Sequence, residues 1–304
     1  MAAGILFAVL TGLTWALISM TMSVVARHKI SVFLFYWIGN TAAALIAWIF
    51  VPDWRSLRPL SFSALFPLLL LLTLAGFVNV ASQAFMVLTL KLGHNGISIA
   101  VRNCAALIPF LIGVLVWHNE VGLLNIAGLL MLLGGLVMIA LGNRRNGEAE
   151  LRRVSWKWLL AVAASLGCSG AFQTMNSLTA RLEPGLLNTG LRVPMLLTSC
   201  ALGNCVASLL RGDMAQVRNG VPHVIPAMAL GWSLTAIGSY YFMFRSLDSM
   251  NAAGASALVF PIVIGVNIST FSLYSKFRLK EPYSVLSVTS LLLCLFGIIL
   301  LTWK

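Results

Sequence analysis

The chain has 304 residues, of which 60% are hydrophobic and only 9% are charged, and its mean hydropathy is +0.95. Because soluble domains carry about 25% charged residues, this composition excludes a soluble protein and indicates an integral membrane protein. The net charge of +12 would suggest a nucleic-acid partner in a soluble chain, but here the basic residues lie mostly in short loops, where they orient a protein in the bilayer.

Ten apolar runs follow one another along the chain, each of about the 20 residues that a helix needs to cross roughly 30 Å of hydrocarbon. They lack the alternation of apolar and polar residues that is typical of membrane β-barrels. The sequence therefore predicts an all-α integral membrane protein that contacts the lipid bilayer and binds no nucleic acid. Its ten transmembrane helices are expected at 4–26, 31–51, 64–90, 95–117, 121–142, 156–180, 185–210, 223–247, 251–275 and 283–303.

Two parts of the sequence resemble each other in the same order. The segment "AVLTGLTWALISMTMSVVAR" at 8–27 aligns with "AVAASLGCSGAFQTMNSLTA" at 161–180, and "GISIAV" at 96–101 aligns with "GASALV" at 254–259. The two alignments have offsets of 153 and 158 residues. Matches in a common order at similar offsets indicate an internal duplication.

The duplication divides the chain into two five-helix repeats, 1–142 and 156–304, joined by a polar linker at 143–155. In each repeat a glutamate opens the last predicted helix, Glu120 in the first and Glu281 in the second. Because five is an odd number, the second repeat is expected to cross the bilayer in the opposite direction to the first. Such inverted repeats are the architecture of many secondary transporters.

Basic residues are distributed unequally between the two sides of the predicted bundle. The loops after odd-numbered helices carry 13 Lys and Arg residues, whereas the opposite face, which includes both termini, carries four or five. The positive-inside rule then places the odd loops in the cytoplasm and both termini outside.

Residues that could support catalysis or bind a metal are scattered. The five cysteines lie inside apolar runs without a C-x-x-C pair, and the four histidines lie at predicted helix ends or in loops without metal-ligand spacing. No set of nucleophile, base and acid can be assembled. We therefore expect no enzymatic activity, no metal and no cofactor.

Five segments combine small and apolar residues with a few polar ones: "TWA" (14–16), "SQAFMVLTLKLGHNGISIAV" (82–101), "IPFLIGVLVWHNE" (108–120), "YYFMFRSLDSMNAAGASALVFP" (240–261) and "FRLKEP" (277–282). Together they resemble the drug/metabolite transporter superfamily, in particular its ten-helix EamA-type members, over essentially the full chain. The resemblance implies the fold and leaves the substrate undetermined. Members of that family usually keep both termini in the cytoplasm, opposite to the side that the basic residues indicate here, so the orientation stays open.

Arg102 and Asn103 lie inside the fourth predicted helix, which is otherwise apolar. An arginine in hydrocarbon costs about 2.5 to 3.5 kcal/mol on insertion scales, and a guanidinium keeps its charge because its pKa exceeds about 12. All eight Asp and Glu residues fall in loops or at predicted helix ends, so no acid inside the membrane is expected to neutralise Arg102. Its fork of donors suits a carboxylate or a phosphate, which predicts an anionic group on the substrate.

Other polar and aromatic side chains are predicted to share a substrate cavity with Arg102 near the middle of the bilayer, where inverted-repeat transporters bind substrate. Each has an alternative role: an amide can join neighbouring helices, an aromatic ring can anchor at the interface, and Arg192, near the start of its helix, can reach the headgroups. Asp248 is expected to pair with Arg245, three residues earlier. The candidate substrate-binding residues are Trp15, Gln83, Asn103, Gln173, Asn176, Arg192, Tyr241 and Asn267.

These features favour a secondary transporter for a small anionic or zwitterionic metabolite, of the amino acid or organic acid class, that works by alternating access as a monomer or homodimer. We expect it in the cell membrane, which is the inner membrane if the source is a Gram-negative bacterium. A multidrug or cation/proton antiporter of the same fold is an alternative, but it needs a carboxylate inside the membrane. A non-transporting membrane scaffold is a third possibility.

Overall fold

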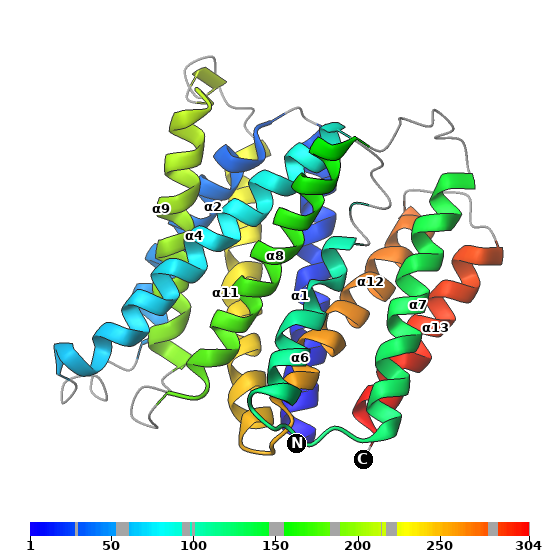
Figure 1. Ribbon diagram of the computed structural model, residues 1–304. Helices are drawn as coiled ribbons and strands as arrows, with labels where there is room; N and C mark the ends of the chain where they lie inside the picture. The colour runs from blue at the N-terminus through cyan, green and yellow to red at the C-terminus, as the bar shows by residue number, and fades with distance from the viewer. Residues whose placement is uncertain are drawn as a thin grey trace.

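The computed structural model is a bundle of α-helices that run side by side in alternating directions (Figure 1). It describes residues 1–27, 30–52, 61–92, 98, 101–145, 155–182, 189–213, 215–216, 224–278 and 285–303. Ten α-helices and two short 3-10 helices are bounded within these residues, which include no β-strand. Glu281 and most of the predicted linker at 143–155 lie outside the described residues.

Each predicted helical segment overlaps one of the ten α-helices. Among the described residues, six helical spans are long and apolar enough to cross a membrane, and they lie in α1, α2, α4, α8, α9 and α12. These spans indicate an all-helical membrane protein. The helices are α1 (Ala2–Arg27), α2 (Val32–Phe50), α4 (Phe62–Leu92), α6 (Leu107–Leu115), α7 (Leu123–Arg145), α8 (Trp156–Thr179), α9 (Thr189–Leu210), α11 (Val224–Asn251), α12 (Val259–Arg278) and α13 (Val285–Thr302), with the 3-10 helices η1 (Cys104–Ala106) and η3 (Ser256–Leu258).

The fourth predicted helix, at 95–117, is not continuous. A helical turn at 101–103 leads into η1 and then into α6, which is only nine residues long. Pro109 has no backbone N–H to donate four residues back, so the carbonyl of Ala105 has no ordinary helical partner at this point. The 3-10 turn therefore coincides with the place where proline interrupts the α-helical hydrogen bonds.

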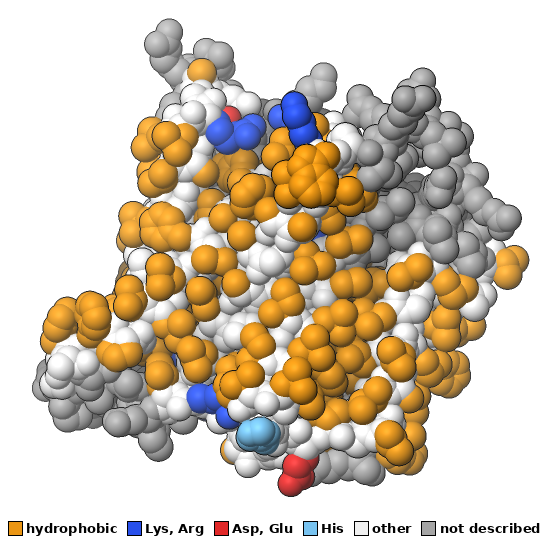
Figure 2. Space-filling model, in the orientation of Figure 1, with side chains coloured by type: hydrophobic (Ala, Val, Ile, Leu, Met, Phe, Trp, Pro, Cys, Tyr) orange, Lys and Arg blue, Asp and Glu red, His pale blue; other side chains and the backbone are white. Residues whose placement is uncertain are grey.

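The outer surface of the bundle is apolar. Phe50, Leu123 and Leu210 are among many large hydrophobic side chains that are exposed. On the face shown in Figure 2 hydrophobic side chains cover the middle, and charged side chains gather toward the two ends. This pattern suits a helical bundle in hydrocarbon, where the backbone hydrogen bonds are satisfied within each helix and charges reach the water on either side.

Both chain termini lie at the same end of the bundle, which we call the terminal end (Figure 1). The connections from α6 to α7 and from α11 to α12, the end of α8 and the start of α9 lie at this end too. Neighbouring helices come from distant parts of the sequence: α4 packs against α8 and α9, α1 against α11 and α12, α2 against α9 and α11, and α7 against α13.

Helices α7 and α13 touch through their backbones. A Cβ atom added to Gly128 would lie 2.6 Å from the carbonyl oxygen of Gly297 and 2.8 Å from the backbone nitrogen of Leu301. Farther along, a Cβ on Gly135 would lie 2.6 Å from the sulfur of Cys294. Since the hydrophobic effect drives no association between helices within lipid, close packing of small residues of this kind is what holds such helices together.

We expect Gly128→Ala to destabilise the bundle because the added methyl group meets backbone atoms that cannot turn aside. Overpacking of this kind costs about 1 to 3 kcal/mol, which thermal unfolding in detergent micelles would register as a lower Tm. Gly134→Ala is the matched control, because nothing lies within 4 Å of a Cβ added there. That variant should keep or slightly raise the Tm, and equal losses in both variants would contradict the proposed contact.

Candidate functional site

A group of polar side chains lies inside the bundle where α4, α9 and α11 approach each other. The amide nitrogen of Asn79 on α4 donates to the sulfur of Cys200 on α9 over 3.6 Å. Tyr240 on α11 lies close to both side chains. Three helices thus contribute a thiol, a carboxamide and a phenol to one small region.

Two further residues extend this region toward α2 and the helical turn before η1. Tyr36 on α2 interacts electrostatically with Arg102, and also with Cys200 and Tyr240. Both Tyr36 and Arg102 are half-buried, and within the described residues Arg102 makes no hydrogen bond or ion pair. We call Tyr36, Asn79, Arg102, Cys200 and Tyr240 the central cluster.

Arg102, Cys200 and Tyr240 of the central cluster lie about halfway through the bundle, whereas Tyr36 is four residues after the start of α2. Arg102 is 13 residues before the end of α6 at the terminal end, which corresponds to about 20 Å of helix. Cys200 is 11 residues after the start of α9, and Tyr240 is 11 residues before the end of α11. Both are therefore about 16 Å from the terminal end of their helices, a depth that places the cluster near the middle of a bilayer of ordinary thickness.

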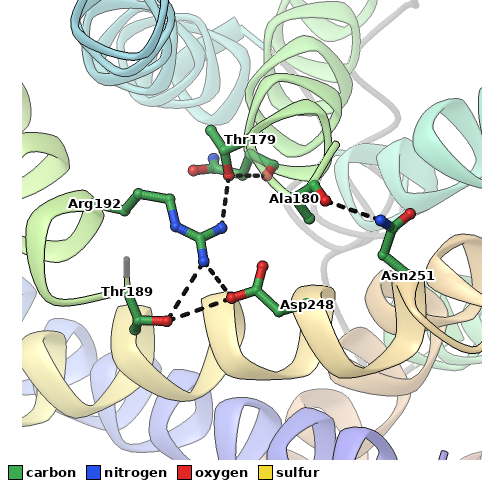
Figure 3. A network of polar contacts seen from close by, with 7 residues as sticks. Thr179, Ala180, Thr189, Arg192, Asp248 and Asn251 are labelled. Carbon is green, nitrogen blue, oxygen red and sulfur yellow. Dashed lines mark hydrogen bonds and ion pairs between the residues drawn. The ribbon is translucent and has the colours of Figure 1, made fainter. Parts of the chain in front are cut away.

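A second polar network surrounds Arg192 close to the terminal end (Figure 3). Arg192 is fully buried, and its Nη2 forms an ion pair with Oδ2 of Asp248 on α11. Its Nη1 donates to Oγ1 of Thr179 over 3.1 Å, and Nη2 also donates to Oγ1 of Thr189 over 3.4 Å. The guanidinium lies 4.7 Å from the centroid of the Phe244 ring. The network therefore ties α8, α9 and α11 together.

This network corrects two predictions. Asp248 pairs with Arg192, which is 56 residues away in the sequence, and not with its neighbour Arg245, which is exposed. Arg192 neither reaches toward the headgroups nor presents a free guanidinium to a cavity. A buried arginine needs a carboxylate and hydrogen-bond acceptors to offset the loss of water, and helix packing supplies both here.

The other predicted residues have varied surroundings. Asn176 is buried and its Nδ2 donates to the carbonyl oxygen of Phe172 over 2.8 Å. Trp15 packs against the apolar core, and Tyr241 makes an edge-to-face contact with Phe242, with ring centroids 6.0 Å apart.

The side-chain oxygens of three further predicted residues are buried without a hydrogen-bond partner among the described residues: Gln83, Gln173 and Asn267. Asn103 is half-buried and immediately precedes η1. In the part of the chain that the structure describes, no hydrogen bond or ion pair joins these residues, or Trp15, Asn176 and Tyr241, to the central cluster.

Arg102 is the one member of the central cluster that is among the substrate-binding residues predicted from the sequence. Cys200 is predicted to be a small core hydrophobe, and no prediction is made for Tyr36. Their polar contacts depend on which helices become neighbours, which no local pattern reveals. Besides Arg102, the carboxamide of Asn79 in the third predicted helix is a polar signal that the sequence shows.

Comparisons with known proteins support the fold alone. No protein-family model matches the chain, and no curated protein sequence matches it either. A solved structure described only as "Crystal structure of protein" has a TM-score of 0.71 and 16% sequence identity, and the match covers 99% of this chain and 96% of that chain. The architecture is therefore shared with an experimentally determined protein over nearly its whole length.

We expect Asp248→Leu to destabilise the protein strongly, because it leaves the Arg192 guanidinium buried without its counter-charge. Breaking such a pair from one side costs about 3 to 5 kcal/mol, measured as a drop in Tm in detergent micelles. The double variant Arg192→Leu with Asp248→Leu should lose less than the single one. Arg245→Gln, on the same helix but exposed, is the control and should stay within about 0.5 kcal/mol of the parent. Strictly additive effects of the two substitutions would refute the ion pair.

Proposed function

We propose that this protein is a secondary transporter with ten transmembrane helices in two inverted five-helix repeats, and that it moves a small anionic or zwitterionic metabolite across the cell membrane by alternating access. The amino acid and organic acid classes fit this description. Three features support the proposal: the symmetry of helix packing, the position of the central cluster and the lack of an acidic partner for Arg102 among the described residues.

The helix neighbours are those that an inverted repeat would produce. If α1, α2, α4, α6 and α7 correspond to α8, α9, α11, α12 and α13, the contact of α4 with α8 becomes that of α11 with α1. Likewise the contact of α6 with α8 becomes that of α12 with α1, and the contact of α4 with α9 becomes that of α11 with α2. All of these pairs pack together.

The same correspondence holds for individual residues. A Cβ added to Gly12 on α1 would meet Val266 on α12, and one added to Gly170 on α8 would meet Ile108 on α6. Gly12 and Gly170 are 158 residues apart, and so are Ile108 and Val266. This offset equals that of the segments 96–101 and 254–259 and differs by five residues from that of the segments 8–27 and 161–180. Two close contacts related by one offset support a duplicated and inverted architecture, which in secondary transporters places the substrate near the middle of the membrane.

A second pair of contacts agrees with this correspondence. A Cβ added to Gly39 on α2 would meet Trp232 on α11, and the Ser233 hydroxyl donates to the carbonyl oxygen of Gly39 over 2.9 Å. In the equivalent contact between the repeats, a Cβ added to Gly76 on α4 would meet Ser199 on α9. The two crossings again join equivalent helices through a glycine and a serine, at offsets of 157 and 160 residues.

The charge of Arg102 carries the proposal for the substrate. Of the acids that the structure describes, Glu120 and Asp213 lie at the ends of the bundle, and Asp248 is paired with Arg192. A guanidinium at mid-depth keeps its charge and favours a ligand that brings a carboxylate or phosphate. Tyr36 interacts with Arg102, and Asn79 and Tyr240 lie in the same central cluster, so hydroxyl and amide groups that suit the remaining polar atoms of a small metabolite are close to it.

The same observation weakens the antiporter alternative. Exchange of a cation for a proton needs a membrane carboxylate that is available to both. Asp248 is the described carboxylate within a helix of the bundle, and its charge is already balanced by Arg192. A scaffold without transport activity would be favoured instead if no solute were taken up.

The test is uptake and competition in proteoliposomes with anionic, zwitterionic and cationic metabolites. We expect anionic or zwitterionic compounds to compete best, and Arg102→Leu to reduce their uptake at least about tenfold, as loss of a charge-assisted hydrogen bond does. Arg102→Lys should retain part of the activity because it keeps the charge but loses the planar fork.

Arg278→Gln is the matched control, because it removes a positive charge from an exposed residue at the end of α12. Its uptake should equal that of the parent. If cationic compounds compete best and Arg102→Leu transports normally, the proposed substrate class is wrong. If no compound is taken up in a protein-dependent and saturable way, the scaffold is favoured.

A further inference from the structure

Three chain segments meet at the side chain of Arg181, which follows α8 at the terminal end. Its Nη2 donates to Oδ1 of Asn119 over 3.0 Å and to Oγ of Ser256 over 3.1 Å. The guanidinium also lies 4.3 Å from the centroid of the Trp117 ring. Trp117 and Asn119 belong to the connection between α6 and α7, whereas Ser256 is in η3 before α12. One side chain therefore joins the two proposed repeats.

Additional bonds close the contact between the two connections. The Nδ2 of Asn119 donates to Oγ of Ser256 over 3.1 Å, so Asn119, Ser256 and Arg181 bond one another in a triangle. The backbone N–H of Glu120 donates to the carbonyl oxygen of Gly254 over 3.1 Å. Asn119 and Ser256 are buried, with only 8% and 2% of their surface exposed.

The backbone around the contact is held in an uncommon conformation. His118, between Trp117 and Asn119, has a φ of 50°, which is the left-handed region that residues other than glycine rarely adopt. This turn allows both neighbours of His118 to reach Arg181. Strain of this kind persists only where the surroundings enforce it and is common at switch regions.

The helices leave little space at this point. A Cβ added to Gly113 near the end of α6 would lie 2.6 Å from the Cβ of Ala257 in η3 and 2.9 Å from Nδ2 of Asn119. The end of α6 thus packs closely against η3, with the Ala257 methyl group and the Asn119 amide at the contact. Gly113 is two residues before the end of α6, whereas Arg102 is 13 residues before it, so this contact lies closer to the terminal end than Arg102 does.

We propose that Arg181 is the positioning residue that latches the terminal end of the transport pathway shut, by holding the α6–α7 connection against η3. The inference rests on the proposed function, because a latch matters only if a pathway alternates. Arg181 differs from Arg192 in the way that a latch requires. It is half-buried and bonded to neutral acceptors, so water can replace its partners when the segments separate, whereas Arg192 is fully buried against a carboxylate.

Partial burial lowers the pKa of the Arg181 guanidinium from its usual value. Because that usual value exceeds about 12, the group remains charged at neutral pH. The strength of the latch therefore depends on the hydrogen-bond acceptors of Arg181, and a change in those acceptors should shift the equilibrium between a closed and an open terminal end.

The test uses Cys200 as a reporter, since it is 1% exposed in the central cluster. In a variant whose other four cysteines are replaced, sulfonatoethyl methanethiosulfonate, which does not cross membranes, is added to one side of vesicles whose orientation is known from a tag on the N-terminus. We expect Arg181→Gln to raise the rate of Cys200 labelling from the terminal side about tenfold, because a charge-assisted hydrogen bond is lost, and to lower the rate from the opposite side.

A second variant shifts the equilibrium the other way. Asn119→Asp gives Arg181 a carboxylate partner, which should hold the latch more tightly and lower the rate of labelling from the terminal side. Arg245→Gln removes an exposed positive charge on α11 and is the control, with rates equal to those of the parent. If Arg181→Gln were merely misfolded, its Cys200 would be labelled faster from both sides, and Asn119→Asp would show no opposite change in the labelling rate.

Equal rates for Arg181→Gln, Asn119→Asp and the parent would overturn the latch, and so would faster labelling from both sides in Arg181→Gln without a decrease in Asn119→Asp. The experiment needs no substrate, so it is independent of the uptake assay. Reciprocal changes in labelling together with a complete lack of uptake would refute the transport proposal and leave the latch standing.

Discussion

The cost of placing a charged guanidinium among apolar helices is the constraint on which the rest of this structure depends. Three arginines meet that cost in different ways. Arg192 has a carboxylate, two hydroxyls and an aromatic ring around it, and Arg181 has neutral acceptors and a ring near the water. Arg102 has neither an ion pair nor a hydrogen bond within the described residues. The degree of compensation thus decreases from Arg192 through Arg181 to Arg102, in line with the roles proposed for them as a fixed support, a latch and a substrate-binding group.

These differences also organise the bundle along its length. The compensated arginine fastens α8, α9 and α11 to one another close to the terminal end, which keeps those helices in register beside the central cluster. Above this fixed region, Tyr36, Asn79, Cys200 and Tyr240 bring weaker hydrogen-bonding groups to mid-depth. Groups of this kind can exchange one partner for another at little cost, whereas the ion pair cannot.

The positions of the helices were predictable because a bilayer of fixed thickness demands apolar segments of a minimum length. The interruption at η1 was not predicted, although Pro109 was a visible signal for it. Contacts between segments that are distant in the sequence could not be predicted, for a different reason. A single sequence shows only local neighbours, so Asp248 was assigned to Arg245, and the true partner emerged only when α9 and α11 packed together. Cys200 and Tyr36 were overlooked for the same reason, because their polar groups become significant only when other polar side chains lie beside them.

The glycine contact between α7 and α13 has a consequence for motion. A contact made by backbone atoms has no side chains that could turn to accommodate sliding or tilting, and Asn125 adds hydrogen bonds from α7 to the carbonyl oxygens of Leu300, Leu301 and Trp303 at the end of α13. We therefore expect these two helices to move as one rigid unit. In the proposed transporter each repeat contributes one helix to this unit, which would supply a common axis that stays fixed while the two ends of the bundle open in turn.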